Sequence, residues 1–298
     1  MNEFGNSIQP EGHEDKTIAL KVSTLYATLS GVPHLRLVGL HNGPSLSDNP
    51  FGRLLGYIED LVSSCRQEVS MDTLNAMVGA RSALLGAHHR ATFEHGRRGG
   101  SYGYQVIVSS ELSNEINADI FEMAMWLHDE GKIGVPTTIL NKPTKLTQEE
   151  FAIMRTHTNI GAELSGAFLF RILSVPEENR TEEWQRTCNA AEIILGVQKS
   201  HHYCWKKKND SEEDIEGLAV PIEARLAHIS DAFDVMTSRR PYNAPISIKA
   251  ALRQLERESG TAFDPRLVSI FTSAARSNLS EFKDIQHSFD TRKDEEVA

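Results

Sequence analysis

The sequence predicts an all-α protein. Apolar side chains recur at steps of three and four residues along most of the chain, the spacing that places them on one face of an α-helix. Capping residues such as Ser, Thr, Asp and Asn stand before these stretches, and Gly or Pro punctuates them. We expect a small N-terminal helical region at residues 1–70, a main helical bundle at 71–280, and a polar, flexible tail at 281–298.

Composition narrows the class of protein. With 298 residues and 40% hydrophobic content, the chain can bury a full core. No apolar run approaches the ~20 residues of a membrane span, and the polar start lacks the apolar core of a signal peptide. We therefore expect a cytoplasmic protein without membrane contact. Three dispersed cysteines with no CxxC pair predict reduced thiols.

The net charge of −10 argues against a DNA-binding function, because affinity for the phosphate backbone needs a basic surface. A small anionic ligand held at a metal remains compatible with this charge. The composition alone thus permits a metal-dependent enzyme or a binding protein for a small anion.

The N-terminal region carries two predicted helices and no recognisable chemistry. The first ends before Gly31 and Pro33, and the second begins at Asn49 and Pro50. We expect this region to serve packing, dimerisation or contact with a protein partner.

A long helix is predicted after Ser70, which can cap it. Its stripe at helical spacing consists of Leu74, Val78, Arg81, Leu85, His88, Thr92 and His95. The first half of this stripe could lie against another subunit. We interpret His88 and His89 as a surface or interface pair.

A His-Asp pair ends the next predicted helix, which spans residues 117–129. His128 shares a helical face with Ile120 and Ala124, so its imidazole points toward the core, where it needs a partner. Imidazole beside the Asp129 carboxylate suits a hard divalent metal, and Lys132 can neutralise charge on whatever the metal holds. A capped helix end without a ligand role is the alternative.

Three more histidines follow on two predicted helices. Thr147 and Glu150 form a capping box, and the helix that they open carries His157 in its apolar stripe. Another stripe ends at His201 and His202. Adjacent residues on a helix diverge by ~100°, so these two could address two metals. The alternatives are a core histidine at 157 and cationic imidazoles at a helix C-terminus.

The last part of the chain combines carboxylates with a guanidinium pair. Pro221 opens a helix in which Asp231 and Asp234 follow alanines on one ridge, so its backbone can approach a metal closely. Arg239 and Arg240 suit bidentate phosphate binding, although surface solvation is the alternative. The segment 203–216 is predicted to be a loop, and two scaffold helices begin after Ser247 and Asp264. Beyond Ser280 the polar chain is expected to fray.

Five separated motifs together resemble the HD-GYP family, in the order in which that family has them. They are the HD-x-GKIG segment at 128–134, HTNIG at 157–161, His201-His202, Asp231-x-x-Asp234 and Arg240-Pro241-Tyr242. The resemblance runs from about His95 to Phe271. It implies an all-helical HD-domain bundle of the metal-dependent phosphohydrolase type, whose members hydrolyse cyclic di-GMP at two or three iron or manganese ions.

The resemblance also implies roles for single residues. The implied metal ligands, with Asp129 bridging, are His95, His128, Asp129, His157, His201, His202 and Asp231. This sulfur-free set favours iron, with manganese second, over a structural zinc site. Lys132 would stabilise the phosphate oxyanion, Asp234 would orient it, and Arg240 would bind a phosphate.

Two departures from the family pattern change these expectations. Members with three metals carry a Glu one turn before the first histidine, where this chain has Ala91, so we expect two metals. The Gly-Tyr-Pro loop should follow His202, and here a segment from Tyr203 to Lys208 with three lysines stands instead. This indicates a rebuilt substrate or partner surface around a retained set of ligands.

The resemblance implies a phosphodiesterase that hydrolyses cyclic di-GMP or a related dinucleotide through a hydroxide activated by two metals. A second interpretation is a metal-containing signalling protein that binds a cyclic dinucleotide or a partner with little turnover. Hydrolysis of another phosphorylated nucleotide is a third.

Overall fold

The structure is a computed structural model that describes residues 69–173, 175–206, 217–239 and 244–288. Its helices are α3 (Met71–His88), α4 (Arg90–Val108), α5 (Ala118–Leu127), α6 (Thr137–Leu140), α7 (Gln148–Arg155), α8 (His157–Leu173), α9 (Glu182–Ser200), α10 (Ile222–Thr237), α11 (Ile248–Glu258), α12 (Pro265–Ser277) and α13 (Leu279–Ser288). Short 3₁₀ turns are η2 (Glu111–Asn114), η3 (Glu130–Gly134), η4 (Glu177–Asn179) and η5 (Gly217–Ala219). The described residues form no β-strand beyond one isolated bridge, which confirms the predicted all-α class.

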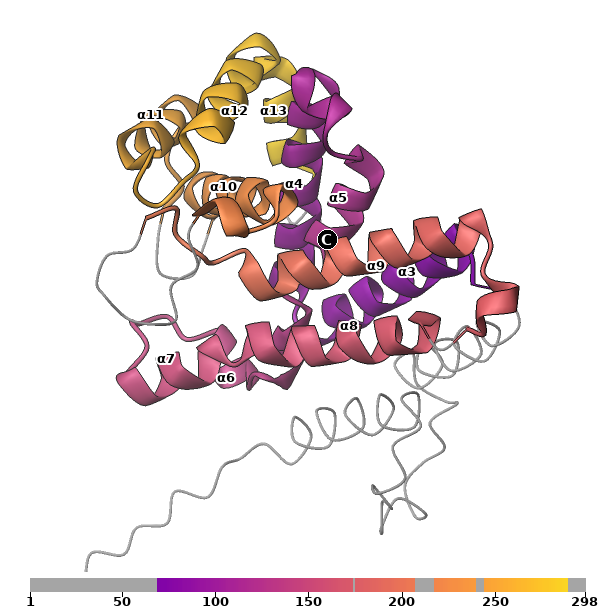
Figure 1. Cartoon of the computed structure of the whole chain (residues 1–298). Helices are drawn as coiled ribbons and strands as arrows, with labels where there is room; N and C mark the ends of the chain where they lie inside the picture. Colours follow the sequence, from indigo (N-terminus) through magenta and orange to yellow (C-terminus); the bar gives the residue numbers. More distant parts are fainter. Residues whose placement is uncertain (1–68, 174, 207–216, 240–243, 289–298) are drawn as a thin grey trace, which may run out of the picture.

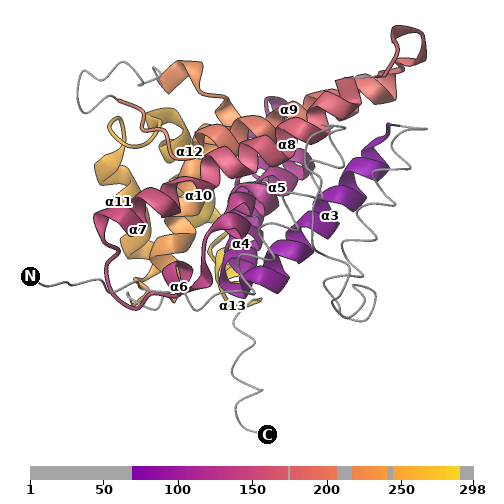
Figure 2. The ribbon, with the colours of Figure 1, turned by 90° about the horizontal axis from the view of Figure 1, so that it is seen from below.

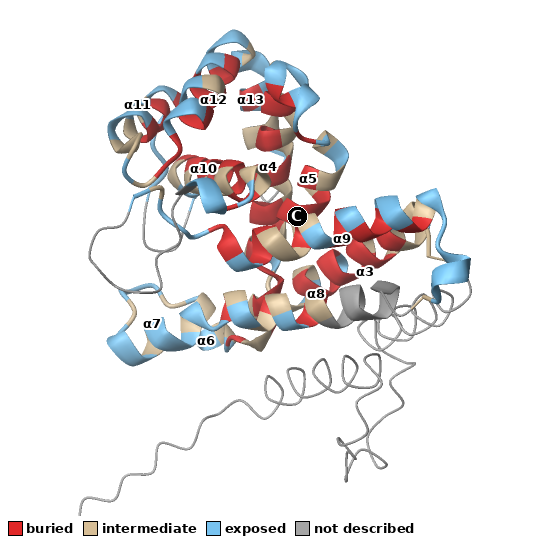
Figure 3. Ribbon diagram, in the orientation of Figure 1, coloured by how far each residue is buried: buried red, intermediate tan, exposed pale blue. Residues whose placement is uncertain are grey.

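Helices α4 and α5 pack against each other at the centre of the bundle. On one side α4 contacts α10, α12 and α13, and on the other α5 contacts α3 and α9 (Figure 1). Helix α8 lies along α9 in both views (Figures 1 and 2). The buried faces of these helices point toward one another, and the outer faces are exposed (Figure 3). Helix α10 also contacts α9, and α8 contacts the turn η3 that follows α5.

Glycines in α4 let its backbone approach α5. A Cβ at Gly103 would lie 2.1 Å from the ring of Phe121, and one at Gly96 would lie 2.9 Å from the carbonyl oxygen of Met125. Such distances are far inside van der Waals contact, so a side chain at either position would push the two helices apart. Because Gly96 follows His95 directly, this close approach also sets the position of the histidine.

The prediction of one long helix after Ser70 is wrong, because the chain forms two helices there, α3 and α4. His89 has an extended backbone conformation, and its ring accepts a hydrogen bond from the amide of Thr92 at the start of α4. This local cap competes with continuation of the helix. The stripe that could have faced another subunit, with Leu74, Val78 and Leu85, is instead buried in the core of the same chain.

A second predicted helix is also divided, at Thr156 between α7 and α8. The capping box of Thr147 and Glu150 is present as predicted, with both hydrogen bonds formed. The predicted starts after Pro221, Ser247 and Asp264 are likewise confirmed as N-caps of α10, α11 and α12. Local capping signals thus located most of the helix starts.

The prediction that the chain frays beyond Ser280 is wrong for residues 281–288. These form most of α13, whose Phe282 is completely buried. Its ring stacks on Tyr102 and meets Phe233 and Phe271 edge to face. One aromatic side chain in a polar segment therefore anchors the helix, a signal too short to appear as a periodic stripe.

Several predictions lie outside the described residues. These are the helices expected within residues 1–68, the lysines at 207 and 208, and Arg240. The partner or dimerisation role of the N-terminal region stays a prediction. Across the part of the chain that the structure does describe, no helix has the length and apolar character needed to span a bilayer.

The aromatic anchor of α13 is testable. Phe282→Ala should lower the free energy of unfolding by about 3–5 kcal/mol, because a fully buried ring is replaced by a cavity. Denaturant unfolding measures the change. Phe151→Ala is the matched control, since that ring is 55% exposed and its loss should change stability by no more than about 0.5 kcal/mol. Equal effects of the two substitutions would contradict the packing described for α13.

Candidate metal centre

His128 and Asp129 lie where α5 gives way to the turn η3. His128 is the C-cap of α5, and its Nδ1 donates a hydrogen bond to the carbonyl oxygen of Met125 at 2.7 Å. This fixes the tautomer that carries the proton on Nδ1 and leaves Nε2 as an acceptor. Gly131 in the turn lies against the start of α8, because a Cβ there would be 1.9 Å from the carbonyl oxygen of His157.

Two more histidines use the same device. The Nδ1 of His157 donates to the carbonyl oxygen of Met154 at 2.7 Å, and that of His201 donates to Val197 at 2.9 Å. The acceptor of His157 belongs to α7, directly before its own helix, and that of His201 belongs to α9, so a backbone carbonyl nearby in the chain orients each ring. The Nε2 atoms are left to face inward, which is how metal-binding histidines are arranged in proteins.

The inward-facing atoms fall into two groups that share one residue. The ligand atoms of His95, His128 and Asp129 lie within 4.8 Å of one another, and so do those of Asp129, His157, His201 and His202. The two oxygens of Asp129 serve different groups. Its Oδ2 is 3.3 Å from His128 Nε2, and its Oδ1 is 3.3 Å from His157 Nε2.

Asp231 joins the first group from α10. Its Oδ1 lies 2.8 Å from the Nε2 of His95. Burial opposes ionisation of Asp231, but the hydrogen bond from His95 outweighs it and holds the pKa of the carboxyl well below its usual value. The structure thus brings together all seven residues predicted as ligands from the sequence.

The donor set is suited to hold divalent metal. His128 Nε2, His201 Nε2 and Asp129 Oδ1 are buried and take part in no hydrogen bond of acceptable geometry. Buried polar atoms nearly always have a partner, and each of these three would gain one by binding a cation. Nitrogen and oxygen ligands in this number suit iron, manganese or zinc, and the absence of sulfur from the set disfavours a structural zinc site.

Electrostatics keep the centre ready to bind cations. Burial penalises the charged form of Asp129, yet Lys132 and His128 outweigh that penalty and hold the pKa of its carboxyl well below the usual value. Burial lowers the pKa of His201 well below its usual value and lowers that of His157 as well. The carboxylate is therefore ionised and these two imidazoles are neutral near pH 7, which are the forms that bind metals.

Asp234 has a different position from the one predicted. Its fully buried carboxylate accepts a hydrogen bond from His95 Nδ1 at 2.6 Å and one from Arg98 at 2.6 Å. Lys132, which Asp234 was expected to orient, instead donates to Asp129 Oδ2 at 2.5 Å. Asp234 thus stands behind His95 and fixes the direction of its ring.

Arg98 was missed in the sequence, although a signal existed. It follows His95 by three residues on α4, so the two share a helical face and reach the same carboxylate. Burial raises the pKa of the Asp234 carboxyl, whereas the hydrogen bonds from His95 and Arg98 lower it. The hydrogen bonds have the larger effect, so the pKa lies below its usual value. Asp234 therefore stays ionised behind His95.

The segment after His202 is anchored away from the ligands. The amide of Trp205 donates to the carbonyl oxygen of Ala262 at 3.0 Å, and that of Lys206 donates to Thr261 at 2.9 Å. These bonds attach the segment to the turn between α11 and α12. The Lys206 side chain is exposed.

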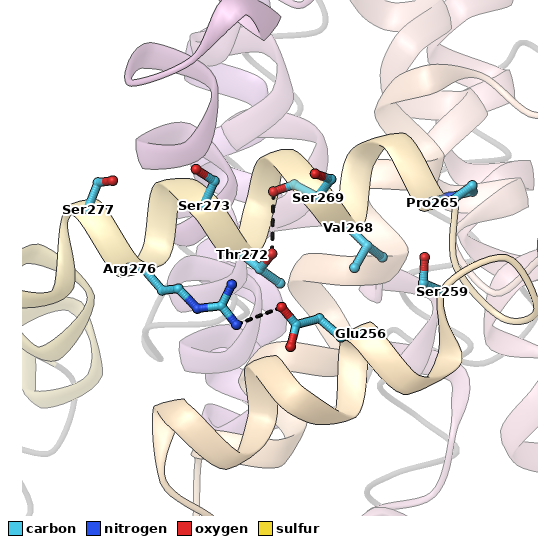
Figure 4. Close-up of a pocket in the computed structure, with 9 residues that line it drawn as sticks. All are labelled: Glu256, Ser259, Pro265, Val268, Ser269, Thr272, Ser273, Arg276 and Ser277. Atoms are coloured by element: carbon cyan, nitrogen blue, oxygen red, sulfur yellow. Dashed lines mark hydrogen bonds and ion pairs between the residues drawn. The ribbon is translucent and has the colours of Figure 1, made fainter.

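A groove between α11 and α12 is separate from this centre (Figure 4). Its lining consists of Glu256, Ser259, Pro265, Val268, Ser269, Thr272, Ser273, Arg276 and Ser277. An ion pair of 2.6 Å between Arg276 and Glu256 crosses it. None of the seven predicted ligands lines the groove, so we assign it no part in the chemistry.

The chain is similar in sequence to several known proteins. A family model described as HD domain matches residues 82–267. A cyclic di-GMP phosphodiesterase of Thermotoga maritima is 32% identical over 70% of this chain and 49% of its own length. A cyclic di-GMP phosphodiesterase response regulator of Xanthomonas campestris is 35% identical over 54% of this chain and 38% of its own. A 3'3'-cGAMP-specific phosphodiesterase of Vibrio cholerae is 29% identical over 68% of this chain and 34% of its own length.

The fold and the His-Asp centre define a helical protein of the HD type. The chain belongs to the HD domain family, and the resemblance seen in its motifs is confirmed. It spans about half or less of the length of the three relatives described above.

The neutral, buried histidines predict a pH dependence of stability. Because the folded state lowers the pKa of His157 and His201, the unfolded state binds more protons below about pH 6.5. The raised pKa of His128 acts in the opposite direction, whereas the lowered pKa values of His202 and His228 act in the same direction as those of His157 and His201. The free energy of unfolding of the metal-free protein should therefore fall as the pH drops from 7 to 5, which denaturant unfolding measures.

Two variants locate the source of this pH effect. His201→Gln removes one lowered group and should flatten the pH dependence, whereas His287→Ala, at an exposed position, should leave it as in the parent. A metal-free protein whose stability rises or stays level between pH 7 and 5 would contradict the assignment of neutral imidazoles.

Proposed function

We propose that this chain is a metal-dependent phosphodiesterase that hydrolyses a cyclic dinucleotide, with cyclic di-GMP as the first candidate. The observation that carries the proposal is the sharing of Asp129 between two groups of ligand atoms. A bridging carboxylate holds two cations close together, which is the arrangement that many phosphate-cleaving enzymes use. The names of the relatives support the choice of substrate class.

The residues divide between two cation positions. His95, His128, Asp129 and Asp231 would hold one cation, and Asp129, His157, His201 and His202 would hold the other. Iron is the first candidate for both positions, and manganese is the second. The chemistry that such cations would supply here is polarisation of a phosphodiester and activation of water near neutral pH.

The chain's own residues orient the ligands and the substrate. Asp129 stays ionised beside Lys132, and Asp234 with Arg98 holds the ring of His95 in place. Lys132 has 20% of its side chain exposed, so its ammonium can reach a phosphate while it contacts Asp129. There it would neutralise charge that develops on the phosphate oxygens. Arg240 remains a predicted phosphate ligand outside the described residues.

A second candidate function is a metal-containing protein that binds a cyclic dinucleotide and cleaves it slowly. The observation that favours it is the segment after His202, which lacks the Gly-Tyr-Pro sequence and is attached to the turn at Thr261 and Ala262. Trp205 and Lys206 are thus held at the turn between α11 and α12, and the sequence at the place of the family's loop differs from that of the family. Turnover and binding must therefore be measured separately.

Metal content tests the ligand assignment. The parent, purified with iron or manganese under reducing conditions, should hold two metal ions per chain. His128→Ala should lose most of this metal, because one inward-facing nitrogen of the first group is removed. Elemental analysis gives the stoichiometry. His287→Ala, an exposed histidine remote in sequence, should keep the parental content, and metal-free parent protein would sink the proposal.

Turnover tests the role of Lys132. Lys132→Ala should reduce the rate of cyclic di-GMP cleavage by about 10²–10³-fold, because it removes a positive charge beside the reacting phosphate. Lys206→Ala is the control, since its exposed side chain lies on the anchored segment, and it should change the rate little. Cleavage is followed by chromatography of the products, with 3'3'-cGAMP assayed in parallel. A metal-loaded parent that binds either nucleotide without cleaving it supports the second candidate function instead.

A further inference from the structure

A buried ion pair lies directly behind the metal centre. Glu130 follows Asp129 at the start of the turn η3, and its carboxylate accepts two hydrogen bonds from the guanidinium of Arg81. The Nε of Arg81 donates to Oε1 of Glu130 at 2.7 Å, and one of its NH₂ groups binds Oε2. The two side chains are only 2% and 3% exposed.

The pair is part of a network that reaches two further helices. Arg81 also donates to the hydroxyl of Ser165 on α8 at 3.0 Å. Gln198 on α9 donates from Nε2 to the carbonyl oxygen of Leu127 at 2.9 Å and to Glu130 Oε2 at 3.2 Å. Arg81, Ser165 and Gln198 are all buried.

Apart from α3, which carries Arg81, the elements that the network joins carry or adjoin predicted metal ligands. Leu127 directly precedes His128, and Glu130 directly follows Asp129. Ser165 lies two helical turns after His157 on α8, and Gln198 lies one turn before His201 at the end of α9. The network therefore connects, from behind, the turn that bears the bridging carboxylate and the two helices that bear the second group of ligands.

Stability alone does not explain a charged pair at this depth. Removing two charges from water is costly, and an apolar pair of similar volume usually stabilises a fold as well or better. What a bidentate Arg-carboxylate pair adds is direction, because its two parallel hydrogen bonds fix both position and angle. Arg81 belongs to α3 and stands one residue before the segment that matches the HD domain family, so the ion pair connects α3 to the turn η3.

We propose that Glu130, held by Arg81 and Gln198, is a positioning residue that sets the distance between the two groups of metal ligands. It does not itself face the cations, since both of its oxygens are bound by Arg81 and Gln198. It fixes η3 against α8 and α9, so that the two oxygens of Asp129 can serve both groups. This inference rests on the proposed two-metal function.

Manganese binding to the full chain tests the proposal. The variants are Glu130→Gln, Arg81→Met and the double variant Arg81→Met/Glu130→Leu. The double variant replaces the buried ion pair by apolar side chains of similar volume, so it is designed to remain folded. Each should bind the second manganese ion about 10–100-fold more weakly than the parent, the usual effect of removing a partner behind a metal ligand. The electron paramagnetic resonance signal of a coupled manganese pair should weaken in parallel.

The matched control is Arg266→Met. Arg266 also makes a two-pronged ion pair with a glutamate, Glu115, but that pair is on the surface, with the arginine side chain 48% exposed. This variant should bind manganese like the parent. If the Arg81 and Glu130 variants lose only thermal stability while both manganese affinities and the coupled signal stay parental, the network is merely structural and the proposal is overturned.

A readout without metal separates this proposal from the proposed function. In the metal-free parent, the Nδ1 protons of His128 and His157 should give protected imidazole resonances in nitrogen-15 NMR, because both are bonded to backbone carbonyls. These resonances should broaden or vanish in the folded double variant. If the parent binds no manganese but the variant loses these signals, the proposed function fails and the positioning role stands. Signals retained unchanged in the double variant would overturn the positioning role.

Discussion

The centre depends on one buried carboxylate that has to remain charged. Asp129 is 2% exposed, and a carboxylate at that depth is stable only when opposite charge and hydrogen-bond donors surround it. Lys132 supplies part of that charge from three residues away. The imidazoles of His95, His128 and His157 lie around the same carboxylate. The same requirement that makes the residue costly for a stable fold makes it a suitable ligand for cations.

The helical bundle meets this requirement by placing ligands at helix ends. His128 caps α5, His157 begins α8, and His201 caps α9. Each Nδ1 proton goes to a backbone carbonyl three or four residues earlier in the chain, so each ring is oriented by the segment directly before it. Only the relative placement of the helices then has to be correct for the Nε2 atoms to converge.

That placement comes from close packing and from buried polar contacts. Gly96 and Gly103 let α4 lie directly on α5, and Gly131 lets η3 lie on α8. The Arg81, Glu130 and Gln198 network holds the same elements together on the side away from the ligands. Apolar packing sets the distance between helices, and directional hydrogen bonds prevent them from sliding along one another.

The sequence by itself determined the all-α class, most helix starts and the chemical types of the ligands. These properties are local, because apolar periodicity, caps at Thr147, Ser247 and Asp264, and a His-Asp pair can all be recognised within a few residues. The grouping of seven ligand residues was available only as a resemblance to a family. The spacing of His95 and Arg98 places them on one helical face, but their shared contact with Asp234 joins residues far apart in the chain, so no local pattern assigned it. Tertiary structure alone decided the burial of Phe282 and the pairing of Arg81 with Glu130, since each depends on what packs opposite.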